Sequence, residues 1–400
     1  MNGRVEYLIV NGAKVRINDG LLLVVGNHGV GKTEFLHKII GGEYFVEGNQ
    51  NLKIVPMLLT QNHDECPLCE GNHQEYVDFV NAHFDKRLAE MLLQRVPTIE
   101  DLHAHEVNHT FIYRRILLTS LLLETKERML VVFDEPELGA HLLMIRELCV
   151  LIRQLQEMGH IVVVATNSET VVSRLFEDIE QVVRLEKNQK FIQPNADVLE
   201  KEIREFYHQD EYLVRKFSDS KKQESGLCNV LENYIRIYLS SIFRNSIFMI
   251  MHSDGVILGE GSSEDVLFDY IDQVLHPKWM RENRIYYLGC LGKSTMPFYF
   301  LFLNHVGIRT VCLFDTDKET NPVHQAYAKA FQYREKNYEH MFSKLALSPD
   351  LEHVLQIDPD YKMASFEKPV HIFQHTFETD QVKDKVIELA NLIKVMFDQM

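Results

Sequence analysis

The sequence has few cysteines and no long apolar run, and each shortage excludes a class of protein. Six cysteines are scattered over 400 residues, and only Cys66 and Cys69 lie close together. This distribution is wrong for a disulfide scaffold and suits a reducing compartment, so we expect a cytoplasmic protein. No apolar stretch reaches the roughly 20 residues that span a bilayer. The first residues also lack a basic segment followed by an apolar one, as in a secretory signal, so we expect no membrane partner.

Basic residues are also scarce. Lys and Arg number 42 against 58 Asp and Glu, which gives a formal net charge of −16 at pH 7. This balance argues against an extended basic surface for nucleic acid. It does not exclude nucleic acid, because metal ions and local basic patches can offset the repulsion between phosphates and carboxylates.

Apolar runs alternate with helix-like segments, which predicts an α/β protein with two modules. Continuous apolar runs, as opposed to alternating ones, favour parallel strands that are buried on both faces. The strand-like runs lie at 21–26, 51–58, 129–134, 160–166, 181–187, 255–260, 284–289 and 310–315. The intervening helix-like segments lie at 75–94, 139–158, 263–275 and 296–307. We predict a first α/β domain over 1–195, a helical connector over 196–249 and a second α/β domain over 250–400.

A phosphate-binding loop follows the first of these runs. The segment GNHGVGKT at 26–33 has the G-x-x-x-x-G-K-[ST] spacing between a strand and a helix. Gly26, Gly29 and Gly31 allow backbone N–H groups to surround phosphate oxygens at a helix N-terminus, where the helix dipole favours anions. Lys32 would contact the β- and γ-phosphates of ATP, and the hydroxyl of Thr33 would bind Mg²⁺.

Two adjacent acidic residues complete this predicted ATP site. Asp134 ends the apolar run at 129–134 and would hold Mg²⁺ through water, and Glu135 would act as general base for the attacking water. The DEPE segment resembles the ABC-type branch of ATPases, which implies head-to-head dimerisation and thus a homo-oligomer. In that branch Gln61 would be the Q-loop glutamine. The segment 103–113 lacks the signature motif, and Asn167 replaces the usual switch histidine, so the resemblance supports ATP binding more than rapid hydrolysis.

A second feature of the first module is the pair of cysteines in HDECPLCEGNH, at 63–73. Thiolates and imidazoles at this spacing suit tetrahedral Zn²⁺, and His63, Cys66, Cys69 and His73 would form one local site. Two alternatives remain open: two chains share one zinc through their CPLC segments, as in SMC-like repair ATPases, or the turn carries two free thiols. The histidine-rich segment 102–109 is interpreted as a solvated helix face.

Carboxylates follow two of the apolar runs in the second module. Glu260 ends the run at 255–260, and Glu264 begins the next helix; Asp315 and Asp317 follow the run at 310–315. The carboxyl ends of parallel strands meet at one edge of a sheet, which is where α/β folds place their ligands. Clustered carboxylates repel one another unless cations lie between them, so we expect Mg²⁺ or Mn²⁺ at this edge.

The E-G-x-x-E and D-x-D segments resemble a TOPRIM domain. A phosphate-loop ATPase followed by such a domain is similar to the OLD family, whose members are ATP-regulated nucleases that often act in defence against phage. The resemblance covers roughly 1–195 and 250–375. It implies that Glu352 is a further metal ligand, that Lys368 stabilises negative charge in the transition state, and that Lys293 contacts phosphate.

These observations lead to one main hypothesis and several alternatives. The main hypothesis is an ATP-regulated, metal-dependent nuclease that acts on DNA or RNA, with a partner defence protein as one expectation. The alternatives are a non-catalytic ATP-dependent sensor or scaffold with a vestigial TOPRIM site, and a toxic tRNA nuclease controlled by its ATPase module. An SMC-like repair ATPase is disfavoured, because no heptad arms flank 59–74.

Overall fold

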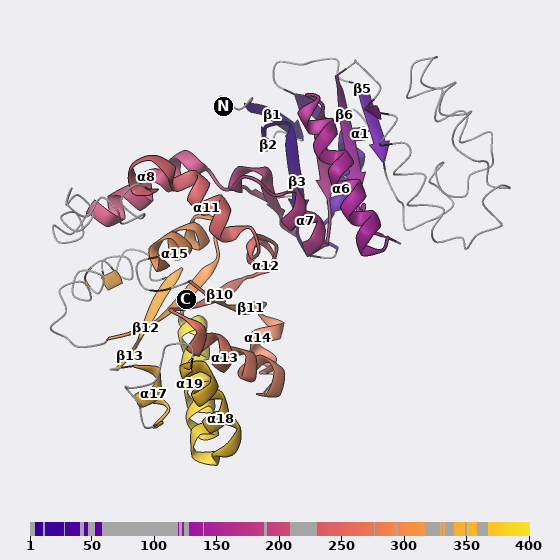
Figure 1. The fold of residues 1–400 in the computed structure, drawn as a ribbon. Helices are drawn as coiled ribbons and strands as arrows, with labels where there is room; N and C mark the ends of the chain where they lie inside the picture. The colour runs from indigo at the N-terminus through magenta and orange to yellow at the C-terminus, as the bar shows by residue number, and fades with distance from the viewer. Residues whose placement is uncertain are drawn as a thin grey trace, which may run out of the picture. The chain divides into compact units, whose positions relative to one another are not determined.

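The computed structural model describes most of the two predicted modules. The described residues are 5–10, 13–27, 29–40, 44–46, 53–57, 119, 122–123, 128–138, 140–187, 190–208, 230–275, 277–290, 292, 295–316, 329, 331–332, 340–348, 350–357 and 367–400. They fall into two compact units (Figure 1), one formed by 1–193 with 240–251 and the other by 194–239 with 252–400. The segment expected as a connector therefore contributes to both units.

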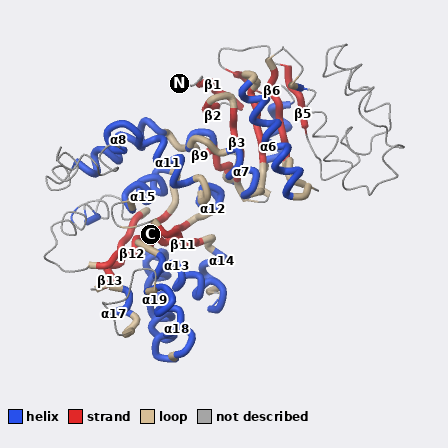
Figure 2. The backbone as a smooth tube through the Cα atoms, viewed as in Figure 1, coloured by secondary structure: helices blue, strands red, loops and turns tan. Residues whose placement is uncertain are grey.

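Among the described residues, the first unit is built on a sheet of nine strands (Figure 2). Five of them are parallel and run in the order β8-β3-β7-β6-β5. Antiparallel β1, β2 and β4 extend the sheet beyond β3, and β9 pairs with β8. The strands are β1 Val5–Val10, β2 Ala13–Asn18, β3 Leu21–Val25, β4 Tyr44–Val46, β5 Lys53–Met57, β6 Met129–Asp134, β7 Ile161–Ala165, β8 Val182–Leu185 and β9 Phe191–Ile192.

Every residue of β3, β6 and β7 is buried. This complete burial explains why their sequences are continuous apolar runs, since neither face of the central strands meets water. The helices of this unit are α1 Lys32–Ile40, α6 Leu142–Glu157, α7 Glu169–Leu175 and α12 Ile247–His252, with a 3₁₀ turn at Ile179–Gln181. The parallel strands predicted for this module are confirmed, whereas the predicted helix at 75–94 lies outside the described residues.

The second unit is built on a parallel sheet of four strands in the order β11-β10-β12-β13. The strands are β10 Gly255–Gly259, β11 Ile285–Gly289, β12 Arg309–Asp315 and β13 Phe342–Leu347. The helices are α8 Ala196–His208, α13 Ser262–Tyr270, α14 Lys278–Glu282, α15 Met296–His305, α17 Leu351–Val354, α18 Lys368–Glu378 and α19 Asp380–Gln399. Helix α11 Ile235–Phe243 spans the boundary of the units, and π-helical turns occur at Val230–Tyr234 and Ile271–Leu275. The three strands predicted for this module are confirmed, and β13 is an additional strand.

Helix α15 covers one face of the second sheet. All eight residues from 296 to 303 are buried, so this helix is apolar all round, as expected for one enclosed by other elements. It contacts β10 and β12 on one side and α8 on the other. Phe206 of α8 meets Phe300 edge to face, with 5.4 Å between ring centroids.

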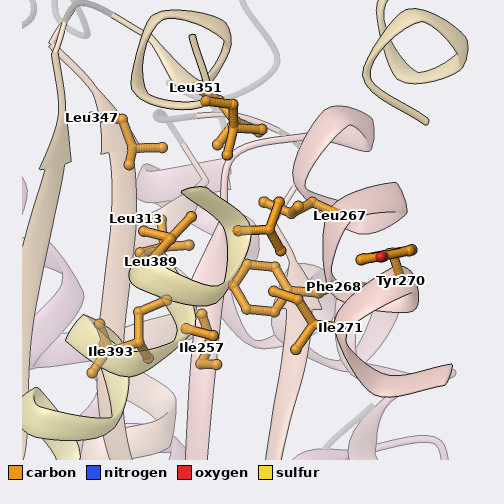
Figure 3. Packing of buried hydrophobic residues seen from close by; sticks show 14 of the residues in the cluster. Ile257, Leu267, Phe268, Tyr270, Ile271, Leu313, Leu347, Leu351, Leu389 and Ile393 are labelled. Carbon is orange, nitrogen blue, oxygen red and sulfur yellow. The ribbon is translucent and has the colours of Figure 1, made fainter. Parts of the chain in front are cut away.

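A second apolar layer fills the space between β10, β12, α13 and α19. Figure 3 shows Ile257 and Leu313 from the strands beside Leu267 and Phe268 of α13 and Ile393 of α19. This layer packs α13 against β11 and α19 against β12. None of the described helices has the length and hydropathy to span a membrane.

The buried layer predicts a contrast between two neighbouring residues of α19. Ile393 is fully buried, whereas Leu392 is 47% exposed. Ile393→Ala should lower the free energy of unfolding by about 2–4 kcal/mol, because it leaves a cavity, and Leu392→Ala should lower it by less than about 1 kcal/mol. The only tryptophan, Trp279, packs against this layer, so its fluorescence during urea unfolding reports on the second unit. Equal losses for the two variants would contradict the packing.

Candidate functional site

The phosphate loop joins the buried end of β3 to the first turn of α1. Gly26, Gly29 and Gly31 all have positive φ values, of 153°, 75° and 97°. A Cβ atom on Gly26 would lie 2.5 Å from the carbonyl oxygen of Leu185, so no larger residue fits there. The ammonium of Lys32 lies inside the loop and donates to the Gly26 carbonyl oxygen at 2.7 Å. Thr33 is exposed in the first turn of α1.

The acidic pair lies at the carboxyl end of β6. Asp134 is 2% exposed. The N–H of Glu135 donates to the Ala165 carbonyl oxygen of β7 at 2.8 Å, and its φ of 40° is unusual for a residue other than glycine. Burial lowers the pKa of Lys32, and the carboxylates of Glu135 and Asp134 oppose part of this shift. The structure thus brings Lys32, Asp134 and Glu135 together.

Two further residues belong to this site, and Asn167 is one of them. Its side-chain oxygen accepts from Lys32 Nζ at 2.8 Å, and its Nδ2 donates to Glu135 Oε1 at 2.6 Å. Glu137 is the other, because its Oε1 accepts from Thr166 Oγ1 at 2.8 Å and from the backbone N–H of Asn167 at 2.9 Å. Burial raises the pKa of Glu137. The sequence signalled Glu137 only as the last letter of DEPE, and its contact with the residue after β7 was not predictable.

Several predicted site residues lie outside the described residues. They are Gln61, Asp317, Lys293 and the proposed zinc ligands His63, Cys66, Cys69 and His73. Their roles stay predictions.

In the second unit, β10 and β12 are adjacent and parallel, so their carboxyl ends meet at one edge. Glu260 follows β10, and its Oε1 accepts from the backbone N–H of Asp315 at 2.8 Å. Glu264, in the first turn of α13, is 3% exposed, and its Oε2 accepts from the N–H of Gly261 at 3.2 Å. Burial raises the pKa of Glu264, and the charge of Glu352 adds to the shift.

Glu352 and Lys368 come from later segments and approach the same edge. Glu352 of α17 is 6% exposed, and Lys368 Nζ at the start of α18 lies 3.3 Å from its Oε1. Burial alone would lower the pKa of Lys368, but the carboxylates of Glu352, Asp350 and Asp315 together raise it. Residues from three separate parts of the chain therefore share one electrostatic site.

The donor set at this edge fits a hard divalent cation by its chemistry, because carboxylate oxygens are the ligands that Mg²⁺ and Mn²⁺ prefer. Glu260, Glu264, Asp315 and Glu352 would hold it. Within the described parts of the chain, however, no three His, Cys, Asp or Glu side chains lie close enough to bind one metal ion. Each of these glutamates instead accepts a hydrogen bond or an ion pair from the protein.

A comparison with known families identifies one part of the second unit. Residues 251–317 match the family described as "Overcoming lysogenization defect protein-like, TOPRIM domain". These residues form an OLD-like TOPRIM domain. The match contains β10, α13, β11, α15 and β12, and with them Glu260, Glu264 and Asp315. A phosphate-loop α/β unit combined with this TOPRIM domain fits the ATPase-plus-TOPRIM architecture of the OLD family, as the sequence predicted.

Two solved structures resemble part of the chain. An ATP-binding subunit of an ABC transporter is 15% identical, with 50% of this chain and 93% of that chain covered and a TM-score of 0.33. A metal-chelate-type ABC transporter in an inward-facing conformation is 18% identical, with 50% and 85% covered and a TM-score of 0.32. At these TM-scores the two likenesses carry no weight. No curated protein matches the chain.

Gly259 allows α13 to approach the sheet closely. A larger residue at this position should therefore disturb metal binding, whereas the same change at Gly261 should not. A Cβ atom there would lie 2.3 Å from the Tyr287 hydroxyl oxygen and 2.9 Å from Glu264 Cβ. Gly259→Ala should therefore displace Glu264 and weaken Mn²⁺ binding at least several-fold, as measured by calorimetry. Gly261→Ala is the matched control, because the nearest atom to its Cβ would be 4.0 Å away. Equal Mn²⁺ affinity of the two variants would contradict this geometry.

The raised pKa of Glu264 predicts a specific pH dependence of stability in the absence of metal. The folded chain holds the proton of this carboxyl more tightly than the unfolded chain, in which the ordinary value is 4.5. Its contribution to the free energy of unfolding is thus fully present below pH 4.5 and declines as the pH rises through the folded pKa. Urea unfolding from pH 4 to 8 should show a smaller decline for Glu264→Gln than for wild type. Glu388→Gln, on the surface of α19, is the control, and parallel curves for wild type and Glu264→Gln would refute the assignment.

Proposed function

We propose that the chain is an ATP-regulated nuclease that depends on a divalent metal and hydrolyses phosphodiester bonds in nucleic acid. The observation that carries this proposal is the acidic edge of the second sheet. Glu260 accepts from the N–H of Asp315, the charge of Glu352 raises the pKa of Glu264, and Lys368 pairs with Glu352. A polyanionic substrate would be repelled by these carboxylates alone. A bound cation reverses the sign of the local charge, so the same cluster then attracts a phosphodiester.

Each residue of the cluster has a role that its surroundings suggest. A bound Mg²⁺ or Mn²⁺ would polarise the phosphodiester and lower the pKa of a water molecule. The carboxylates of Glu260 and Asp315 would hold the cation, with Asp317 as a further ligand from the sequence pattern. Lys368 would remain protonated at neutral pH, since its pKa is raised, and would stabilise negative charge on the transition-state oxygens.

The first unit would supply regulation by ATP. Lys32 within its glycine loop would contact the phosphates of ATP, and Thr33 at the start of α1 would bind Mg²⁺. The ammonium of Lys32 donates to the Gly26 carbonyl oxygen, and the charges of Asp134 and Glu135 act on it. We propose that nucleotide binding sets the oligomeric or conformational state of the chain. By its resemblance to the OLD family, we further propose a homo-oligomer that acts in defence against phage, with or without a partner protein.

One observation favours a second candidate, a non-catalytic ATP-dependent scaffold. Glu260, Glu264 and Glu352 are engaged by protein groups, and no three acidic or metal-binding side chains of the described residues form a metal cluster. This candidate predicts no cleavage of plasmid DNA or of tRNA with Mg²⁺ or Mn²⁺, either with or without ATP. The tRNA arm also separates a toxic RNA nuclease from a DNA nuclease.

Two substitutions should separate the functions of the two units. Asp315→Ala removes a proposed metal ligand but keeps the backbone N–H that donates to Glu260 Oε1. Cleavage should therefore fall at least 100-fold while ATP binding is unchanged. Lys32→Ala should abolish ATP binding and leave Mn²⁺ binding in the TOPRIM domain intact. Asp398→Ala, on the surface of α19, is the matched control. If Asp315→Ala lost ATP binding as completely as cleavage, the two-site account would be wrong.

A further inference from the structure

The side chain of Asn167 connects the lysine of the phosphate loop with the glutamate that follows β6. Its amide accepts from Lys32 Nζ at 2.8 Å and donates to Glu135 Oε1 at 2.6 Å. Lysine only donates hydrogen bonds and an ionised carboxylate only accepts them, so the amide has one orientation that satisfies both neighbours. Neither aspartate nor alanine can make both contacts.

The backbone around Asn167 is fixed independently of these two contacts. Its N–H donates to Glu137 Oε1 at 2.9 Å, and the same oxygen accepts from Thr166 Oγ1 at 2.8 Å. Ser168, the next residue, caps α7 through the N–H of Val171. The amide is therefore presented from a rigid point between β7 and α7. A change in what the amide contacts must therefore come from rotation of the Asn167 side chain or from movement of Lys32 or Glu135.

We propose that Asn167 is a positioning residue that holds Lys32 and Glu135 together and releases Glu135 when a nucleotide phosphate takes Lys32 from it. This inference rests on the proposed ATP binding by the first unit. The ammonium of Lys32 already has three acceptors in the protein, namely the carbonyl oxygens of Gly26 and Asn27 and the amide oxygen of Asn167. A phosphate oxygen that reaches the ammonium competes with these acceptors. Loss of the Lys32 contact leaves the amide free to turn, which weakens its hold on Glu135.

The charges around Lys32 give this competition a direction. Burial lowers the pKa of Lys32, and the carboxylates of Glu135, Asp134 and Glu137 favour its charged form. A neutral amide oxygen stabilises a charged lysine less than a phosphate oxygen does, because a hydrogen bond between two ionised groups is stronger than one with a neutral acceptor. A phosphate oxygen therefore replaces the Asn167 amide oxygen as an acceptor from Lys32. The loss of that contact then weakens the hydrogen bond between the Asn167 amide and Glu135.

The proposal predicts an increase in affinity, which damage to the site would not produce. Asn167→Ala removes an acceptor that competes with phosphate, so ATP should bind about 3- to 10-fold more tightly than in wild type. Asn167→Asp places a carboxylate beside Lys32 and against Glu135, so ATP should bind at least 10-fold more weakly. Asn195→Ala, which removes an asparagine that caps α8 in the other unit, should leave the affinity unchanged.

A double-mutant cycle tests the coupling to Glu135. The gain from Asn167→Ala should shrink by half or more in a Glu135→Ala background, because the amide is then no longer held toward Lys32. Affinity is measured on the full-length chain by fluorescence of an N-methylanthraniloyl ATP analogue with Mg²⁺, and thermal melting confirms that each variant is folded. Asn167→Ser is the substitute if the alanine variant does not fold, since its hydroxyl is too short to span both partners.

The outcomes separate this inference from the proposed function. Wild type that binds no ATP would overturn the nucleotide site and this inference together. Wild type that binds ATP, with an alanine variant of equal or lower affinity, would overturn the inference alone. Additive effects of the Asn167 and Glu135 substitutions would also overturn it, because they would show that the amide does not link the two side chains.

Discussion

Strands that are buried on both faces leave only their ends for charged side chains, and both proposed sites lie at the carboxyl ends of such strands. In the first unit, β3 and β6 place the phosphate loop and Asp134 at one edge of a sheet. In the second, β10 and β12 place Glu260 and Asp315 at the corresponding edge of another. The apolar interior that makes the strands stable is thus also what concentrates the acidic groups.

This concentration of charge requires a compensating cation at each edge. Lys32 supplies it in the first unit, where it lies among three carboxylates. Lys368 supplies part of it in the second unit through its ion pair with Glu352. The side chain of buried Glu264 accepts from the backbone N–H of Gly261, and its burial raises its pKa. A divalent cation near Glu264 would lower that pKa again, which links metal binding to folding stability.

The strands and the phosphate loop were predictable from the sequence because their signals are local. Continuous apolar runs defined β3, β6, β7, β10, β11 and β12, and the glycine spacing located Lys32. Lys368 and Glu352 were predictable only through the family resemblance. The short sequence segments around them contain no pattern that requires a contact with an acidic cluster. The bridge made by Asn167 was not foreseen, because the sequence showed an asparagine in place of a histidine but not what its amide touches. Contacts of this kind depend on the pairing of β6 with β7, which brings Glu135 and Asn167 side by side.

The central claim is that the chain has two separate cation sites, one for ATP and one for a phosphodiester. Electron paramagnetic resonance of Mn²⁺ binding to wild type, Glu260→Gln and Lys32→Ala, each with and without ATP, tests it most directly. The account predicts Mn²⁺ binding without ATP that is lost in Glu260→Gln and kept in Lys32→Ala. It also predicts additional Mn²⁺ binding in the presence of ATP that is lost only in Lys32→Ala. Mn²⁺ binding that appears only with ATP, and that both substitutions abolish together, would contradict the account.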